Sequence, residues 1–202
     1  MPKIAIDVVL FPNEAMTDTA IAVNREIAQK FSDKISLNKE NAFPHISLCM
    51  GVIDEADVPA VAEILKTIAQ EFSVMNLTAE FLQGHRIPTG EVVAGFDMQN
   101  NKDLQLLHES ICRKLARFLT YDVFAEMLFT PPAIEEITFS WIKNYPEHSS
   151  FAKFNPHITV GVGDPPVKEL PIQFTASRLA LCQLGNYCTC RKVLAETELP
   201  AR

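Results

Sequence analysis

The order of apolar and polar positions along the chain predicts short strands that alternate with amphipathic helices. Apolar runs of about four to eight residues between turn residues are typical of buried strands, and apolar residues at every third or fourth position are typical of helices. The first half of the chain shows a strand pattern at 4–10, a helix pattern from Thr17 or Asp18 to about Phe31, a strand pattern at 43–50, a helix pattern near Pro59 and a strand pattern at 73–82. The second half shows a strand pattern at 91–98, a helix pattern at 101–119, a strand pattern at 156–162, and two strand patterns at 172–184 and 187–197 that Gly185 and Asn186 would join as a hairpin.

The order of these predicted elements repeats. Strand, helix and strand follow one another in residues 4–50 and again in residues 91–162, which predicts a duplicated α/β unit with halves of about 1–90 and 91–202. The second copy is longer because an aromatic-rich insertion of about 120–154 precedes its last strand. Two interpretations of this insertion stay open: a lid or wall against which a base can stack, or a structural insertion with its own small core.

One short motif occurs in both copies. Residues 44–48 read Pro-His-Ile-Ser-Leu and residues 156–160 read Pro-His-Ile-Thr-Val, each within a predicted strand. Because successive side chains of a strand point to opposite faces, the histidine and the hydroxyl residue share one face and the isoleucine points to the other. If the two strands lie side by side, two imidazoles and two hydroxyls meet. Such a set suits acid–base chemistry on a phosphodiester.

Two further histidines are followed by a serine at the same spacing, so the bare pattern is weak. His108 lies on a predicted helix, where residues two apart do not face each other, and it cannot act as a unit with Ser110. His148 lies in a polar, turn-like stretch. The two strand copies therefore remain as the candidate site, and the simpler alternative is that His45 and His157 are unrelated structural histidines.

Composition bounds the class of protein and its partners. The 202 residues suffice for one large domain or two small lobes. A net charge of −7 argues against long nucleic acid but allows a small nucleotide or a short RNA end, because histidines that charge near neutral pH can hold a phosphate. No apolar run reaches the roughly 20 residues of a membrane span and no signal peptide is evident, so we expect a soluble cytoplasmic protein that binds no membrane. The oligomeric state is left open.

The five cysteines are scattered and odd in number, which favours reduced thiols over a disulfide framework. Cys188 and Cys190 form the one close pair. With no second pair at finger spacing they are a poor zinc site, and on the predicted strand the two thiols would simply share a face. The sequence therefore predicts neither a metal site nor a cofactor.

The two motifs and the duplicated unit resemble the 2H phosphoesterase superfamily, which includes 2′,5′-RNA ligase-like proteins and cyclic nucleotide phosphodiesterases. The resemblance spans most of the chain. It implies an α+β fold over residues 1–202, a single bilobal domain in which two antiparallel sheets flank a central cleft with helices outside. It also implies metal-independent chemistry at a phosphodiester or a cyclic phosphate.

The residues that match the superfamily's motifs are the catalytic pair, His45 and His157, and the phosphate ligands, Ser47 and Thr159. In hydrolysis of a 2′,3′-cyclic phosphate, one imidazole would take a proton from water while the other donates one to the departing ribose oxygen, and the resemblance leaves open which does which. Arg191, on the last predicted strand, is a further candidate for binding the substrate phosphate. Tyr187 or an aromatic residue of the insertion is a candidate for stacking on a base.

Other functions stay open. Bacterial 2′,5′-RNA ligase-like members often have an arginine shortly after the second motif, whereas residues 160–164 here read Val-Gly-Val-Gly-Asp, which argues against RNA ends in particular. The same four residues would also serve an enzyme that cleaves linear 2′,5′ or 3′,5′ oligonucleotides, or a ligase-like reaction. A protein of a different class would bind a nucleotide without turnover, or hold a transition metal through His45, His157 and cysteines such as Cys49.

Overall fold

Seven strands and four α-helices make up residues 2–129 and 133–201, the part of the chain that the structure, a computed structural model, describes. The strands are β1 Lys3–Pro12, β2 Ile46–Asp54, β3 Met75–Arg86, β4 Val92–Met98, β5 His157–Val162, β6 Ile172–Leu184 and β7 Cys190–Glu198. The helices are α1 Glu14–Lys30, α2 Val58–Ala69, α3 Lys102–Leu115 and α4 Glu136–His148, with 3-10 turns at η1 Glu55–Asp57, η2 Ala125–Met127, η3 Phe151–Lys153 and η4 Asn186–Cys188. None of the described helices is long and apolar enough to span a membrane.

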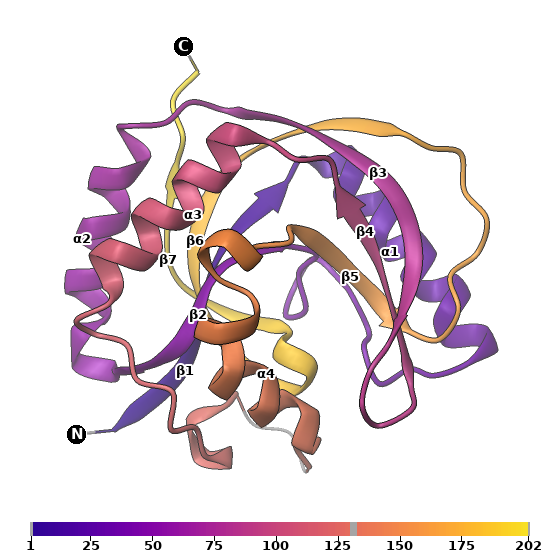
Figure 1. Ribbon diagram of the computed structural model, residues 1–202, viewed down its shortest axis with the longest axis horizontal. Helices are drawn as coiled ribbons and strands as arrows, with labels where there is room; N and C mark the ends of the chain where they lie inside the picture. The colour runs from indigo at the N-terminus through magenta and orange to yellow at the C-terminus, as the bar shows by residue number, and fades with distance from the viewer. Residues whose placement is uncertain (1, 130–132, 202) are drawn as a thin grey trace.

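All seven strands belong to one antiparallel sheet in the order β2-β1-β6-β3-β4-β5, with β7 paired to β6 off this path (Figure 1). The long strand β6 joins the two halves. Its residues 172–176 pair with β3 and its residues 178–184 pair with β7, while β1 lies along its other edge. The predicted α+β fold with antiparallel strands is confirmed, and the two predicted sheets are joined into one because both halves share β6.

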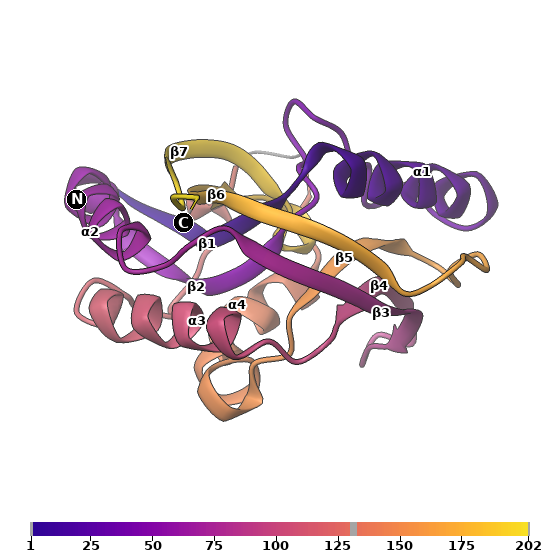
Figure 2. The same ribbon diagram turned by 90° about the horizontal axis from the view of Figure 1, so that it is seen from above.

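Each half places its first helix on the motif strand of the other half. Helix α1 packs mainly against β5, and α3 packs against β2. Figure 2 shows α1 on one side of the sheet and α3 with α4 on the other, while α2 lies beside α3. The largest apolar cluster takes fully buried residues from both halves, among them Ile6 and Phe96, so the two halves are packed around a shared core.

Helices α1 and α3 begin with the same type of cap. Asn13 and Asn101 each accept a hydrogen bond from the backbone N–H three residues further on, at 3.1 and 2.9 Å. The predicted cap at Thr17 or Asp18 is therefore wrong. Only Asn13 separates β1 from α1, so the helix begins one turn before the apolar stripe that indicated it.

The insertion contains a helix that the sequence pattern did not predict. Helix α4 covers the stretch around His148, which is its last residue, and Pro146 lies inside it. Its buried residues Ile142 and Tyr145 pack with Met127 and with one end of the sheet, in a small apolar cluster of their own. The insertion thus has its own core. Whether it also serves as a lid or wall for a base stays a prediction.

The predicted hairpin is confirmed, since β6 and β7 pair antiparallel, but its second strand begins later than predicted. Cys188 lies in the 3-10 turn η4 rather than on a strand, and Cys190 forms a disulfide with Cys182 on the neighbouring strand. The prediction of reduced thiols is therefore wrong for this pair, because strand pairing brings together two cysteines that are far from adjacent in the sequence. Cys49, Cys112 and Cys188 are free and buried.

Candidate active site

The two motif strands lie at opposite ends of the strand order but come together in space. The sheet curves, so that β2 and β5 contact each other although no strand ladder joins them in the described chain. His45 immediately precedes β2, and His157 is the first residue of β5. Burial lowers the pKa of His45 to about 4, and the charge of His157 lowers it further.

Equivalent hydrogen bonds hold the two imidazoles. Nδ1 of His45 lies 2.7 Å from the carbonyl oxygen of Phe43. Nδ1 of His157 lies 2.9 Å from the carbonyl oxygen of Asn155. Because a carbonyl oxygen only accepts, Nδ1 carries the proton in each neutral ring and Nε2 keeps its lone pair. Each histidine therefore has Nε2 as the atom that gains or loses a proton.

Both motif strands contain a β-bulge at the same position of the motif. Ser47 pairs with β1 and Thr159 pairs with β4, and in each strand the register shifts by one residue directly afterwards. Leu48 and Val160 are consequently the extra, unpaired residues. A bulge redirects the side chains around it, so the same local distortion aims the histidine and the hydroxyl of each copy.

His108, on α3, holds the bulge of the first motif strand. Its buried ring donates from Nδ1 to the carbonyl oxygen of Leu48 at 2.7 Å. Its Nε2 accepts a hydrogen bond of 2.8 Å from the backbone N–H of Phe151, shortly before the second motif. The ring also stacks on Phe154, with centroids 4.0 Å apart. His108 thus ties the first motif strand to the segment that leads into the second motif.

Asn24, on α1, holds the bulge of the second motif strand in a similar way. Its buried amide donates to the carbonyl oxygen of Val160 at 2.9 Å and to that of Ile35 at 2.7 Å, and its oxygen accepts from the N–H of Leu37 at 2.8 Å. The last two residues lie in the segment that leads to the first motif. Sequence reasoning missed both braces, and the available signal was a polar residue on the apolar face of each helix.

The two histidines differ in exposure. The His45 side chain is 11% exposed, whereas His157 is exposed. Ser47 and Thr159 are both half-buried. The low pKa of His45 keeps its ring neutral at physiological pH, because burial penalises the charged form.

A buried carboxyl group lies beside His45. Asp7, on β1, is fully buried, and its Oδ2 is 4.0 Å from Nε2 of His45. No hydrogen bond of good geometry reaches either carboxyl oxygen from the described residues, but the Ser47 hydroxyl and the backbone N–H groups of Leu48 and Cys49 face the group and lower its pKa. Burial raises the pKa of Asp7 to about 7. The sequence analysis did not single out this residue, because an aspartate within one apolar run gives no motif.

Around His157 the surface is polar and open. Asp97 pairs directly with His157 across β4 and β5, and its Oδ2 accepts hydrogen bonds from Gln83 at 2.5 Å and from Nε2 of His85 at 3.1 Å. Phe81 pairs with Asp97 from the other side and is 52% exposed. An aromatic ring and several polar groups therefore share the face of His157. The prediction ended strand 73–82 too early, since β3 extends to Arg86.

Solved structures match the fold over nearly the whole chain. Escherichia coli LigT in its apo form superposes with a TM-score of 0.54 at 12% sequence identity, covering 99% of both chains. LigT complexed with 3′-AMP gives 0.51 at 15% identity, with 98% of this chain and 99% of that chain covered. The chain has the LigT fold. A structure described as a phosphoesterase also matches, with a TM-score of 0.55 at 15% identity and the same coverage. No family model and no curated protein matches the sequence.

Glycines adapt this version of the LigT fold after the second motif, in the segment where RNA ligase-like proteins often have an arginine. Gly161 has φ +152°, and a Cβ there would lie 3.1 Å from Ile27 of α1. Gly163 has φ +141°, and its Cβ would lie 2.6 Å from Phe31. Close packing of α1 on β5 therefore accounts for the Val-Gly-Val-Gly-Asp sequence.

The other cations and aromatics singled out by sequence lie around the LigT fold as follows. Arg191 is half-buried, with its guanidinium 5.9 Å from the ring centroid of Phe129. Its neighbour Cys190 accepts a hydrogen bond from the N–H of Phe43, just before the first motif. Tyr187 is 4% exposed and donates to Glu91, so it is not available to stack on a base.

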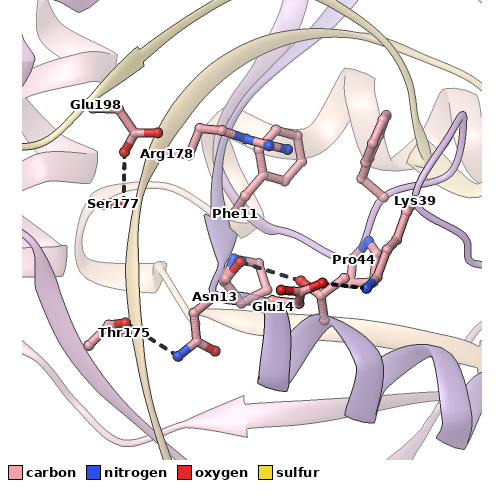
Figure 3. Close-up of a pocket in the computed structure, with 12 residues that line it drawn as sticks. Phe11, Asn13, Glu14, Lys39, Pro44, Thr175, Ser177, Arg178 and Glu198 are labelled. Atoms are coloured by element: carbon pink, nitrogen blue, oxygen red, sulfur yellow. Dashed lines mark hydrogen bonds and ion pairs between the residues drawn. The ribbon is translucent and has the colours of Figure 1, made fainter.

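A pocket of about 380 Å³ lies next to the first motif (Figure 3). Pro44 is part of its lining, whereas neither motif histidine is. The guanidinium of Arg178 lies 4.4 Å from the ring centroid of Phe11, and Lys39 forms an ion pair of 3.2 Å with Glu14. The cations of this pocket thus have partners within it.

The described residues show no group of three His, Cys, Asp or Glu side chains placed to hold a metal ion. Cys49, the cysteine named as an example in the metal-binding alternative, is buried in the main core.

Proposed function

We propose that this protein is a metal-independent phosphodiesterase that hydrolyses a cyclic phosphate, such as a 2′,3′-cyclic nucleotide, or an RNA-end phosphodiester. His45 and His157 would be the catalytic pair. The observation that carries the proposal is the matched pair of Nδ1–carbonyl hydrogen bonds, which leaves Nε2 of each ring for proton transfer. The LigT fold adds support, because solved LigT structures are described as complexes with 3′-AMP, phosphate and NADP+.

The difference in burial supports a division of roles. His45, whose pKa of about 4 keeps it neutral, would be the general base that takes a proton from the attacking water. His157, which is exposed, would be the general acid that donates to the departing ribose oxygen. Products would leave with the imidazoles in exchanged proton states, and solvent would restore them.

The hydroxyls of Ser47 and Thr159 would bind the non-bridging phosphate oxygens. Each follows its histidine on the same face of the same strand, so a phosphate between the rings is within their reach. Arg191 is proposed as a further substrate-binding residue, because it adjoins the residue that pairs with Phe43. A base of the substrate would have room beside the exposed ring of Phe81, which lies on the same face of the sheet as Asp97 and His157.

The direct test is hydrolysis of 2′,3′-cyclic nucleotides by the full chain and by His45→Ala and His157→Ala. We expect each substitution to abolish most of the activity and EDTA to leave it unchanged. Gln29→Ala, at an exposed position of α1, is a control for the effect of a substitution as such. Full activity in either histidine variant contradicts the two-histidine mechanism.

Two other functions use the same residues and are separated by the choice of ligand. A panel of linear 2′,5′ and 3′,5′ oligonucleotides, with RNA ends for a ligase-like reaction, separates a diesterase of linear substrates from one of cyclic phosphates. Calorimetric titration with 3′-AMP detects a nucleotide-binding protein that turns nothing over. Binding without hydrolysis of any substrate in the panel would favour that alternative.

A further inference from the structure

We propose that Asp7 is a positioning residue that sets the proton state of His45, so that the two side chains respond to pH as a pair. The inference rests on the proposed function and adds a residue that lies in neither motif. Its basis is geometric: a fully buried carboxyl group on β1 approaches Nε2, the reactive atom of His45, to 4.0 Å.

The surroundings of Asp7 make a structural role a poor explanation. Both carboxyl oxygens are buried, and no described residue makes a hydrogen bond of good geometry to them. The Ser47 hydroxyl and the backbone N–H groups of Leu48 and Cys49 lower the pKa of Asp7, but burial outweighs them. Ala5 and Val9, which share the face of Asp7 on β1, are fully buried apolar residues. A buried carboxyl group whose donors satisfy it poorly weakens the fold, so its presence beside a reactive imidazole points to the site rather than to stability.

The titratable groups that face this pair come from five elements. They are Cys49 on β2, Cys112 on α3, Tyr145 on α4, Cys188 in η4 and, facing His45, His157 on β5. Burial raises the pKa of the Tyr145 hydroxyl and of the Cys188 thiol, so both stay neutral near pH 7. A hydrogen bond with Cys49 lowers the pKa of Cys112 to about 6, and a thiolate there disfavours the Asp7 carboxylate further.

The pair would act in the proton transfer from water. When water attacks the phosphorus, one of its O–H bonds breaks and an N–H bond forms at Nε2 of His45. The new P–O bond forms as the bond to the ribose oxygen breaks, and that oxygen takes its proton from His157. An ionised Asp7 stabilises the imidazolium formed at His45, whereas a protonated Asp7 does not. Activity should therefore rise as Asp7 ionises.

The experiment compares two variants. Asp7→Asn removes the carboxylate charge and keeps the shape of the side chain, and the control Asp54→Asn removes a carboxylate charge at the far end of β2, away from His45. The rate with a 2′,3′-cyclic nucleotide is measured from pH 5 to 9. For the wild type and Asp54→Asn we expect kcat to rise through about pH 7, the pKa of Asp7. For Asp7→Asn we expect this rise to be absent and kcat at pH 8 to be lower by up to about 10²-fold, the lower end of what a proton transfer contributes.

A second readout does not depend on turnover. In protein with isotope-labelled histidine, the NMR signals of His45, assigned through their loss in His45→Ala, should shift with pH near 7 in the wild type and in Asp54→Asn but not in Asp7→Asn. The same shift in all three proteins overturns the inference. If the wild type cleaves no substrate, the proposed function fails, and the NMR titration still decides whether Asp7 controls the proton state of His45.

A variant of a different chemistry covers the case in which Asp7→Asn does not fold. Asp7→Leu is similar in shape and suits an apolar strand. Because it removes a poorly paired buried carboxyl group, we expect a Tm at pH 8 equal to or above that of the wild type. We also expect the shift of the His45 NMR signals near pH 7 to be absent. A lower Tm with an unchanged titration would mean that Asp7 is only structural.

Discussion

The two halves of the molecule hold the same motif in opposite surroundings. The backbone geometry is the same in both: each histidine bonds its Nδ1 to a carbonyl two residues earlier, and each strand bulges directly after its hydroxyl residue. The surroundings of the two histidines differ. His45 is nearly buried beside the poorly paired Asp7, whereas His157 is exposed on a polar row with Asp97.

This contrast separates what the repeat provides from what each half adds. The shared backbone geometry aims two imidazoles, and two imidazoles in identical surroundings would share one proton affinity. An acid and a base working at one pH need different affinities, and burial on one side only supplies the difference. In the mechanism that we propose, the matching backbone geometry of the two motifs accounts for the placement of the imidazoles, and their different burial accounts for their separate roles.

The largest effect is expected from replacing the two histidines. His45→Ala and His157→Ala should each lower kcat for a cyclic nucleotide by about 10²- to 10⁴-fold, the usual contribution of a proton transfer. The double variant should be little worse than either single one, because base and acid act in one step. Steady-state rates of the three variants check this. Effects that multiply in the double variant would mean that the histidines act independently.

The dependence of the free energy of unfolding on pH below 7 tests the buried surroundings of His45 and Asp7. The pKa of Asp7 is raised from 3.8 to about 7, so its contribution weakens the fold as pH rises from about 4 to 7. The pKa of His45 is lowered from 6.5 to about 4, so its contribution strengthens the fold as pH rises from about 4 to 6.5. In the wild type the two slopes oppose each other, and the free energy of unfolding should be nearly flat over this window.

Removing one of the two groups exposes the other. In Asp7→Asn only the His45 slope remains, so the variant should gain stability over the wild type as pH rises from 4 to 7, by an amount on the order of a few kcal/mol. Urea unfolding at several pH values measures it, with Asp54→Asn as the control. Parallel curves for Asp7→Asn and the wild type would contradict the raised pKa of Asp7.

The two braces test whether the halves depend on each other. His108→Leu leaves the N–H of Phe151 without a partner and the carbonyl of Leu48 with only the weak donor Cys112, and should cost about 1–3 kcal/mol for the buried N–H and less for the carbonyl. His108→Asn, whose amide can still reach Leu48, should lose about half as much. Leu106→Ala, on the exposed face of α3, should change little. Denaturant unfolding measures the losses.

The kinetic effect of His108→Leu distinguishes a residue that positions the site from one that only fills the core. Because His108 links the first motif strand to the segment before the second motif, we expect kcat to fall while KM changes little, with partial rescue by His108→Asn. Asn24→Leu should behave in the same way from the other side. A loss of stability without any change in kcat would show that the braces support the core and not the site.

Much of this fold could be predicted from local sequence patterns. The runs at 4–10 and 156–162 became β1 and β5 because a buried strand is apolar throughout, a property that a short window reveals. Helix α4 could not be predicted in the same way. Pro146 near its end and polar neighbours give the appearance of a turn, and tertiary packing of Ile142 and Tyr145 overrides that local preference.

The candidate site shows the same limit. The histidines could be found because their motif repeats, and the strand period placed the hydroxyls with them. Asp7 and Asn24 could not, since their meaning comes from partners on other elements: β1 brings Asp7 next to His45, and α1 carries Asn24 across to β5. The disulfide of Cys182 was missed for the same reason, because only strand pairing brings it to its partner.

The smallest expected effects come from exchanging the two hydroxyl residues, which sharpens the contrast between the halves. Ser47→Thr adds a methyl group beside the buried His45 and Asp7, and crowding there should cost roughly 1–3 kcal/mol of stability. Thr159→Ser removes a methyl group on the open side and should change stability by no more than about 0.5 kcal/mol. Both keep a hydroxyl, so kcat should fall only where the histidine is displaced, in Ser47→Thr. Thermal unfolding and steady-state kinetics of the two variants measure this. Equal effects would mean that the two sides are equally packed, and burial would then not be what distinguishes the base from the acid.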